Sequence, residues 1–421
     1  MSKEIFYIII GIICFGYILE RILDYLNLKN WSENLPQPLE AFYDVETYKK
    51  AQKYHLHQDK LAFVTDTFNF LILLTVIISG FFGVLNHWVV SCNSSYILQA
   101  LLFFGIIFFA SDIINLPFSI YDTFILEEKY GFNRTSIKTF ILDKLKSYIL
   151  IILIGGVLLS LLIWIITITG SSFWIYAFII LTVFTLLMNF FYGSLIIPLF
   201  NKLTPLEDGE LRNAIQEYAG RIGFPLSNIY VIDGSKRSSK SNAFFTGFGR
   251  KKKIVLYDTL IAKHSTSELI GILAHEIGHY KKKHVMIGLF ISSLEMLLMF
   301  FVMSRFIFNK DLSLAFGSES FALHINLIAF VILYQPVSLI LGLWGNQLSR
   351  KHEFEADTFA VKTTENSELG NALIRLSVDQ LSNLTPHPLY VFFNYSHPPL
   401  LQRLSNIKVQ SETITKSSMK D

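Results

Sequence analysis

The segment Tyr148–Thr169, YILIILIGGVLLSLLIWIITIT, contains no charged residue. A helix that crosses a bilayer needs about 20 predominantly apolar residues, so this segment is long enough to span one. The whole chain shares its bias, because 52% of the 421 residues are hydrophobic and only 16% are charged. Soluble domains carry about 25% charged residues. The composition therefore excludes a disordered chain and an ordinary soluble enzyme, and it indicates a mainly α-helical, polytopic membrane protein.

Six further segments resemble the first in length and apolar character. The seven predicted spans are about 4–22, 62–85, 97–118, 148–169, 173–196, 285–308 and 322–345. The first has both Lys3 and Glu4 at its start and no small-residue cleavage site after it, so we interpret it as a retained span rather than a signal peptide. Charged groups inside spans normally face a bundle interior or a water-filled cavity. Asp112 and Glu295 are therefore candidates to line a chamber or to bond a neighbouring helix.

Lysine and arginine are concentrated in every second loop. The loops 23–61, 119–147 and 197–284 are rich in basic residues, whereas 86–96 and 170–172 contain none. Loops with an excess of Lys and Arg remain in the cytosol. The N-terminus is therefore predicted to lie outside or in a lumen, and the long loop and the C-terminus are predicted to lie in the cytosol.

The predicted spans divide the chain into four parts. They are five transmembrane helices with their loops (1–196), a cytosolic lobe (197–284), two more transmembrane helices (285–348) and a C-terminal cytosolic segment that completes the site (349–421). In the lobe, apolar spacing predicts a helix within 205–222, and 228–233 (NIYVID) is typical of a strand. Residues 241–248 and 253–257 predict a hairpin around a Gly-Arg-Lys turn, and a capped helix is expected to begin at Ser267. We expect a small mixed sheet packed on a helix.

His275, Glu276 and His279 form the pattern HExxH within this capped helix. Residues four apart lie on one face of a helix, so the two imidazoles can bind one zinc ion. Glu276 lies about 100° around the helix and can reach a zinc-bound water as the general base. The alternative is an amphipathic helix with exposed polar residues. The apolar side of this helix and the presence of a possible third ligand argue against it.

A hydrolytic zinc site needs three protein ligands and one open position. The polar segment Ser349–Asp357 (SRKHEFEAD) follows the seventh predicted span directly. Glu353 and Asp357 share a helix face, so one can bind zinc while the other hydrogen-bonds a ligand histidine. Spacing alone does not exclude His352 as the third ligand, and Glu355 is expected to be solvated.

Several segments resemble the type I CAAX prenyl proteases, a family of membrane zinc metalloproteases. The resemblance is carried by YDVETYKKAQKY (43–54), EEKYGFN (127–133), SNAFFTGFGRKKKIVLYDTL (241–260), HEIGH (275–279), SRKHEFEAD (349–357) and SHPPLLQR (396–403). EEKYGFN and NAFFTGF are far more specific than HExxH, which many unrelated proteases share. The resemblance implies a seven-helix barrel that encloses a large water-filled chamber, capped by a small α+β, gluzincin-like zinc protease domain.

The resemblance also implies roles for individual residues. It favours Glu353 as the third zinc ligand, which leaves Asp357 to support a ligand histidine, and it assigns Asn242, His397 and Arg403 to substrate binding. On an edge strand Asn242 can hold an extended peptide. His397 and Arg403 can donate to the scissile carbonyl or its oxyanion, which makes them catalytic candidates. Without the resemblance, a helix start and a solvated face are the ordinary interpretations of these two residues.

The implied activity is hydrolysis of the peptide bond after a prenylated cysteine in a C-terminal CaaX motif, with one Zn²⁺ per chain. The expected partners are a peptide or protein substrate and the lipid bilayer, without nucleic acid. A monomer is expected because the chamber would lie within one chain. The short loop 309–321 and the absence of a lysine-based retrieval signal favour a bacterial inner membrane over the endoplasmic reticulum.

Two alternative functions remain open from the sequence. An HtpX-type quality-control protease shares HExxH, but it has fewer spans than the five predicted before this motif. A channel or transporter with a structural zinc would fill all four zinc positions with protein ligands. The two cysteines, Cys14 and Cys92, lie far from HExxH along the chain and do not supply such ligands.

Overall fold

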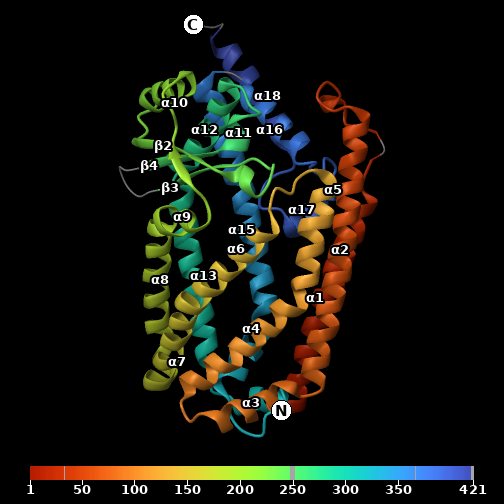
Figure 1. The fold of residues 1–421 in the computed structure, drawn as a ribbon, viewed down its shortest axis with the longest axis vertical. Helices are drawn as coiled ribbons and strands as arrows, with labels where there is room; N and C mark the ends of the chain where they lie inside the picture. Colours follow the sequence, from red (N-terminus) through yellow and green to blue (C-terminus); the bar gives the residue numbers. More distant parts are fainter. Residues whose placement is uncertain (33, 247–251, 366, 419–421) are drawn as a thin grey trace.

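The computed structural model describes residues 1–32, 34–246, 252–365 and 367–418. It is mainly helical, with long helices that form a bundle and a small sheet near one end of that bundle (Figure 1). The helices of the bundle region are α1 (Ser2–Lys29), α2 (Val45–Ile78), α3 (Phe81–Cys92), α4 (Tyr96–Tyr121), α5 (Glu128–Tyr130), α6 (Ile137–Leu150), α7 (Val157–Thr169), α8 (Phe173–Phe191), α9 (Ile197–Phe200), α13 (His284–Phe306), α14 (Lys310–Ala315) and α15 (Leu323–Thr364). This architecture confirms the predicted fold class.

Six helical stretches of the described chain are long and apolar enough to cross a membrane. They are Ser2–Lys29, Val45–Ile78, Tyr96–Tyr130, Ile137–Phe200, His284–Phe306 and Leu323–Thr364. The fourth stretch contains two of the seven predicted spans. Its chain turns back at Gly170–Ser172, between α7 and α8, which lie side by side (Figure 1). Several apolar spans are thus confirmed, whereas the number seven stays a prediction.

The second predicted span ends earlier than expected. Helix α2 ends at Ile78, and Gly80 adopts a left-handed conformation with φ of 69°, after which α3 lies across the end of the bundle (Figure 1). A Cβ atom at Gly83 would lie 2.0 Å from the carbonyl oxygen of Gly317. The start of α3 and the loop after α14 therefore approach to a distance that only glycine allows.

Helix α15 connects the bundle to the lobe without a break. It starts in the apolar bundle, contains Pro336, and continues to Thr364 through the boundary expected at 348/349. Ala329 and Ile332 belong to a buried bundle core, while Ala360 and Val361 belong to a core of the lobe. The polar segment 349–357 is thus the direct extension of an apolar helix, which fixes its position relative to the membrane helices.

The lobe contains a four-stranded sheet with helices packed against it. Its elements are β1 (Leu203–Pro205), α10 (Glu210–Arg221), β2 (Leu226–Ile232), β3 (Ala243–Thr246), β4 (Lys252–Tyr257), α11 (Asp258–Ile261), α12 (Thr266–Lys281), α16 (Glu368–Asp379), α17 (Pro388–Asn394) and α18 (Leu400–Ser418). The strand order is β1-β2-β4-β3, in which β2 and β4 are parallel and the other neighbours are antiparallel. Strand β3 is therefore an edge strand. Ile254 and Leu256 of β4 pack against Leu269 and Leu273 of α12 in a shared core.

These elements follow the sequence patterns closely. The predicted strand and the predicted hairpin are confirmed as β2 and as the pair β3–β4, although the expected turn at 249–251 lies outside the described residues. The predicted cap at Ser267 is wrong by two residues. Ser265 caps α12, because its hydroxyl accepts from the Glu268 N–H and the Glu268 carboxylate accepts from the Ser265 N–H. This reciprocal pair is a capping box.

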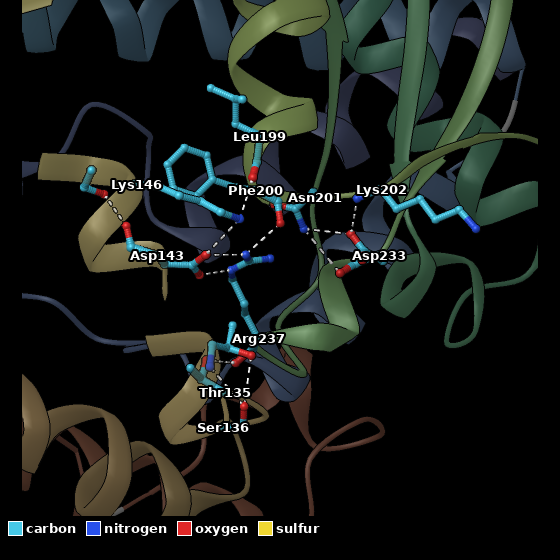
Figure 2. Close-up of polar contacts among 12 residues, drawn as sticks. Thr135, Ser136, Asp143, Lys146, Leu199, Phe200, Asn201, Lys202, Asp233 and Arg237 are labelled. Carbon is cyan, nitrogen blue, oxygen red and sulfur yellow. Dashed lines mark hydrogen bonds and ion pairs between the residues drawn. The ribbon is translucent and has the colours of Figure 1, made fainter. Parts of the chain in front are cut away.

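Hydrogen bonds of Arg237 connect the lobe to the bundle, as Figure 2 shows. Arg237 Nε donates to Asp143 Oδ2 at 2.7 Å, and Nη2 donates to Asp143 Oδ1 at 2.9 Å and to the Phe200 carbonyl at 2.7 Å. The Thr135 hydroxyl donates to the carbonyl of Arg237 at 3.1 Å. Charge-assisted bidentate pairs are among the strongest hydrogen bonds in proteins. We call Arg237, Asp143 and Phe200 the Arg237 clamp; it joins α6 and α9 to the segment before β3.

Candidate active site

Two helices supply the central residues, and a glycine allows them to touch. Gly278 of α12 faces α15, where an added Cβ would lie 3.0 Å from the Cα atom and 3.1 Å from the carbonyl oxygen of Ala356. The two backbones therefore pack with almost no side chain between them. This contact brings His275 and His279 of α12 opposite Glu353 of α15.

The three predicted ligands offer donor atoms around one point. His275 Nε2 and His279 Nε2 are 3.2 Å apart, Glu353 Oε2 is 3.4 Å from His275 Nε2, and Glu353 Oε1 is 3.2 Å from His279 Nε2. Ligands at 2.0–2.2 Å in a tetrahedral zinc site lie about 3.3 Å from one another. Glu353 Oε2 is also buried and has no hydrogen-bond partner within the described chain. The spacing and this unpaired oxygen fit a metal ion of zinc's size.

The alternative third ligand, His352, packs against a different histidine. His352 stacks on His284, with ring centroids 3.9 Å apart and an interplanar angle of 6°. It is not part of the cluster that His275, His279 and Glu353 form among the described residues. The structure therefore brings together His275, His279 and Glu353, the three ligands that the family resemblance implies. His352 does not belong to this cluster.

Asp357 binds the Nδ1 atom of the His275 ring, on the side opposite the Nε2 atom that faces the other ligands. Its Oδ1 lies 2.8 Å from His275 Nδ1, and Arg403 donates to both of its oxygens, through Nη2 at 2.6 Å and Nε at 3.0 Å. Burial would raise the pKa of Asp357, but the hydrogen bond from His275 and the charge of Arg403 lower it below its usual range. An ionised Asp357 accepts the Nδ1 proton, so we assign the tautomer of His275 that presents Nε2 to the metal position.

Burial alone would lower the pKa of His275. The hydrogen bond to Asp357 and the neighbouring carboxylate of Glu353 outweigh this effect and raise the pKa to about 9. The pKa of Glu353 changes in the opposite direction, since the neighbouring imidazoles of His275 and His279 lower it despite burial. The group is thus built to hold positive charge between carboxylates, whether that charge is a proton or a metal ion.

The residue predicted to act as general base, Glu276, lies at the wall of the same cavity as the two histidines. It lies beside His275 in α12, but it is not one of the clustered donors. Burial raises the pKa of its carboxyl group. A carboxylate with a raised pKa beside a metal position is suited to accept a proton from water.

The remaining predicted site residues surround the same point. His397 Nε2 is 3.4 Å from Glu353 Oε1, and the His397 side chain is 66% exposed. Arg403 Nη1 is 3.5 Å from Glu353 Oε2. Asn242 directly precedes the edge strand β3 and lines the cavity together with both of them.

The sequence did not predict that the second ligand histidine, His279, also has a supporting residue. That residue is His284. His284 Nδ1 lies 3.0 Å from His279 Nδ1, and His284 Nε2 lies 3.1 Å from Glu355 Oε2. If His279 presents Nε2 to a metal, its Nδ1–H donates to His284, whose Nε2–H donates to Glu355. Glu355 is 38% exposed, as a solvated residue should be, but its contact with His284 was not predicted. The available signal was a histidine five residues after the motif, at the start of the next helix.

The site opens into a cavity of about 1100 Å³. The cavity extends from β3 and α12 along α13 to Glu295 and along α15 to Gly345, both within predicted spans. Of the two acidic chamber candidates, Glu295 lines this cavity. Asp112 instead accepts a hydrogen bond from Lys144 Nζ at 2.8 Å, which links α4 to α6. The cavity thus connects the site in the lobe with the space between apolar helices.

Comparisons with known proteins agree with this architecture. Residues 24–202 match the family described as CAAX prenyl protease N-terminal, five membrane helices, and residues 205–411 match peptidase family M48. The chain is 36% identical to CAAX prenyl protease 1 of Saccharomyces cerevisiae, over 96% of this chain and 95% of that protein. It is 34% identical to a human CAAX prenyl protease 1 homolog, over 90% of each. The crystal structure of S. mikatae Ste24p superimposes with a TM-score of 0.91 at 35% identity, covering 97% of this chain and 99% of that one.

Proposed function

The chain belongs to peptidase family M48 and carries the N-terminal membrane domain of the CAAX prenyl proteases, and from this we propose a specific reaction for it. The protein is a multi-pass membrane metalloprotease that acts on a peptide or protein substrate. We propose that it binds one zinc ion and hydrolyses the peptide bond after a prenylated cysteine, which releases a C-terminal tripeptide. The observation that carries this proposal is the spacing of 3.2–3.4 Å between donor atoms of His275, His279 and Glu353 at the wall of the cavity.

The three ligands would hold zinc through His275 Nε2, His279 Nε2 and Glu353. When bound, zinc supplies Lewis acidity that lowers the pKa of a water molecule and polarises a carbonyl group. Asp357 fixes the ring of His275, and His284 fixes the ring of His279, each through Nδ1. Such supporting bonds orient ligand rings and raise their basicity.

Glu276 performs the proton transfers. Its carboxylate takes a proton from the attacking water while the water oxygen bonds to the scissile carbonyl carbon. It then delivers that proton to the amine nitrogen as the C–N bond breaks. His397 and Arg403 are proposed donors to the carbonyl oxygen, on which negative charge develops. The exposed imidazole of His397 lies within 3.4 Å of Glu353, which supports this role.

The substrate is proposed to lie along the edge of β3. An extended peptide can add to an exposed sheet edge and be held by main-chain hydrogen bonds. Asn242 lies at the start of this edge and faces the cavity, so its amide can bind the peptide backbone near the scissile bond. The apolar helices that line the rest of the cavity favour a substrate with a lipid chain.

The positions of the termini and the compartment stay predictions. We propose that the N-terminus lies outside or in a lumen and the site faces the cytosol, because basic loops surround the lobe. The bacterial inner membrane expected above is one compartment, and the endoplasmic reticulum is the alternative if the chain is eukaryotic. We also propose a monomer, because one chain forms the whole cavity. Light scattering of the purified protein in detergent tests the last point.

Neither alternative function is favoured. The match to the five-helix N-terminal family separates the chain from a general HtpX-type protease. The three clustered donors and the neighbouring Glu276 support hydrolysis rather than a structural zinc, for which four protein ligands are expected.

A pair of peptides tests the proposed reaction. We would compare a farnesylated CaaX peptide with its unprenylated twin, using purified protein in detergent and mass spectrometry to locate the cut. The proposal predicts release of the tripeptide from the farnesylated peptide, and loss of at least about 100-fold in rate for Glu276→Gln. Equal cleavage of both peptides would refute the requirement for a prenyl group. Absence of cleavage with zinc bound would refute the CAAX assignment.

A further inference from the structure

The cavity contains a lysine that the proposed chemistry does not use. Among the described residues that line the cavity, the lysine and arginine side chains are Lys240 and Arg403. Arg403 already has a role at the catalytic centre, because it bonds Asp357 twice and is a proposed donor to the carbonyl oxygen. Lys240 lies away from that centre, two residues before Asn242, and its side chain is 36% exposed.

We propose that Lys240 binds the free C-terminal carboxylate of the substrate. The inference rests on the proposed function, in which a tripeptide follows the scissile bond. Such a substrate brings a negative charge into the cavity at a fixed distance from the bond that is cut. A buried or half-buried carboxylate needs a charged hydrogen-bonding partner, and an ammonium group supplies one.

The order of the residues along the chain agrees with this assignment. Lys240 comes two residues before Asn242, and Asn242 directly precedes the edge strand β3. A substrate that runs antiparallel to β3, with its first leaving residue beside Asn242, directs its other two leaving residues toward Ser241 and Lys240. The carboxylate of a three-residue tail then ends beside Lys240. The prenylated cysteine lies on the opposite side of Asn242, toward β3.

The backbone just before the edge strand β3 also has a side-chain partner. Gln380 Nε2 donates to the carbonyl of Ser241 at 3.1 Å and lines the cavity itself. Because the Ser241 carbonyl already accepts this hydrogen bond, a charged side chain beyond it is the stronger partner for the end of a short tail. Lys240 directly precedes Ser241 and is the charged residue nearest to it along the chain.

Lys240 is held in position before any substrate arrives. Its Nζ lies 2.9 Å from Glu127 Oε2 and donates to the Tyr54 hydroxyl at 3.0 Å, and it lies 4.5 Å from the centroid of the Phe132 ring. The neighbouring Ser239 N–H donates to the carbonyl of Phe132 at 3.0 Å. Glu127 and Phe132 belong to the EEKYGFN segment, which thus positions the lysine. An ammonium group has three N–H donors, so these two contacts leave one for a substrate oxygen.

The test compares two farnesylated CaaX peptides that differ only at the C-terminus, one with a carboxylate and one with an amide. The ratio of their kcat/KM values is measured for each enzyme, so that a loss of folded protein cancels. We expect the wild type to prefer the carboxylate about tenfold to 100-fold, as for a charged hydrogen bond. Lys240→Met should abolish this preference, and Lys240→Arg should retain most of it.

Glu127→Gln is the matched control, because it removes the same ion pair but leaves the ammonium group. It should keep the preference for the carboxylate, because the Tyr54 hydroxyl and the Phe132 ring still hold the ammonium group in position. Loss of the preference in both Glu127→Gln and Lys240→Met, or an unchanged preference in Lys240→Met, would overturn the proposal. So would equal cleavage of the two peptides by the wild type, although the proposed function would then stand. If the wild type cleaves neither peptide, the proposed function itself fails.

Discussion

The imidazole of His275 carries a proton in competition with the metal. Because Asp357 and Glu353 raise its pKa to about 9, the metal-free site is protonated at neutral pH. A histidine must lose this proton to bind zinc. Below pH 9 each unit of increasing pH should therefore strengthen zinc binding about tenfold, and the increase should level off above that pH.

Competition with a fluorescent chelator between pH 6 and pH 10 measures this dependence. Asp357→Asn removes one of the two negative charges beside His275, so the plateau should begin at a lower pH in this variant. Zinc affinity that is constant between pH 7 and pH 9 in the wild type would contradict the assigned arrangement of charges.

His284 supports the second ligand histidine through an acceptor atom. His284→Leu should weaken zinc binding about 10- to 100-fold, because the Nδ1–H of His279 then has no partner. His284→Asn places an amide oxygen close to the position of Nδ1 and should restore most of the affinity. Measured dissociation constants for the two variants distinguish this role from simple packing, for which Asn would be no better than Leu.

At the scale of elements, the site depends on the close contact of α12 and α15. Gly278→Val should force these helices apart, because even a Cβ lies 3.0 Å from the Ala356 backbone. Overpacking of this kind costs about 1–3 kcal/mol. We expect a lower melting temperature together with weaker zinc binding, and Gly278→Ala should show the same changes to a smaller extent.

Gly220 in α10 provides the control for this experiment. A Cβ added there would meet no atom within 4 Å, so Gly220→Ala should leave zinc binding unchanged and keep or increase stability. If Gly278→Val binds zinc as well as the Gly220 variant, the helix contact does not define the metal site.

The sequence was informative about elements whose signals are local. The apolar spans, the strand at 228–233 and the helix with HExxH could be predicted because periodicity and capping act within one element. The choice between Glu353 and His352 could not, because adjacent residues differ only by the rotation of α15 against α12. The end of α2 was missed for a similar reason, since the close approach of Gly83 to Gly317 joins residues far apart in the chain.

For the whole molecule, the Arg237 clamp joins the lobe to the bundle. Arg237→Met removes three charge-assisted hydrogen bonds and leaves Asp143, which is 23% exposed, without its main partner. Each such bond contributes about 1.5–3 kcal/mol. The variant should therefore melt at a lower temperature and become sensitive to proteolysis in the segment before β3.

Two further variants give this prediction its control. Arg237→Lys should recover only part of the stability, because an ammonium group cannot form the bidentate pair. Arg305→Met removes an exposed arginine at the end of α13 and should have little effect. A clamp variant as stable as Arg305→Met would show that the lobe is held by other contacts.

The arrangement of the lobe on the bundle was beyond sequence reasoning. Composition predicted the membrane protein, and the quoted motifs predicted the family, but Arg237 and Asp143 gave no local signal for their pairing. The contacts of His284 and Lys240 also join segments that are distant in the chain. Such contacts depend on tertiary placement, which residue periodicity does not encode.

The most direct test of the central claim is the zinc content of purified protein, measured by mass spectrometry in the wild type, Glu353→Gln and His352→Ala. The site described above predicts one zinc per chain in the wild type and in His352→Ala, and loss of zinc from Glu353→Gln. Loss of zinc from His352→Ala, with zinc retained in Glu353→Gln, would contradict it and make His352 the third ligand.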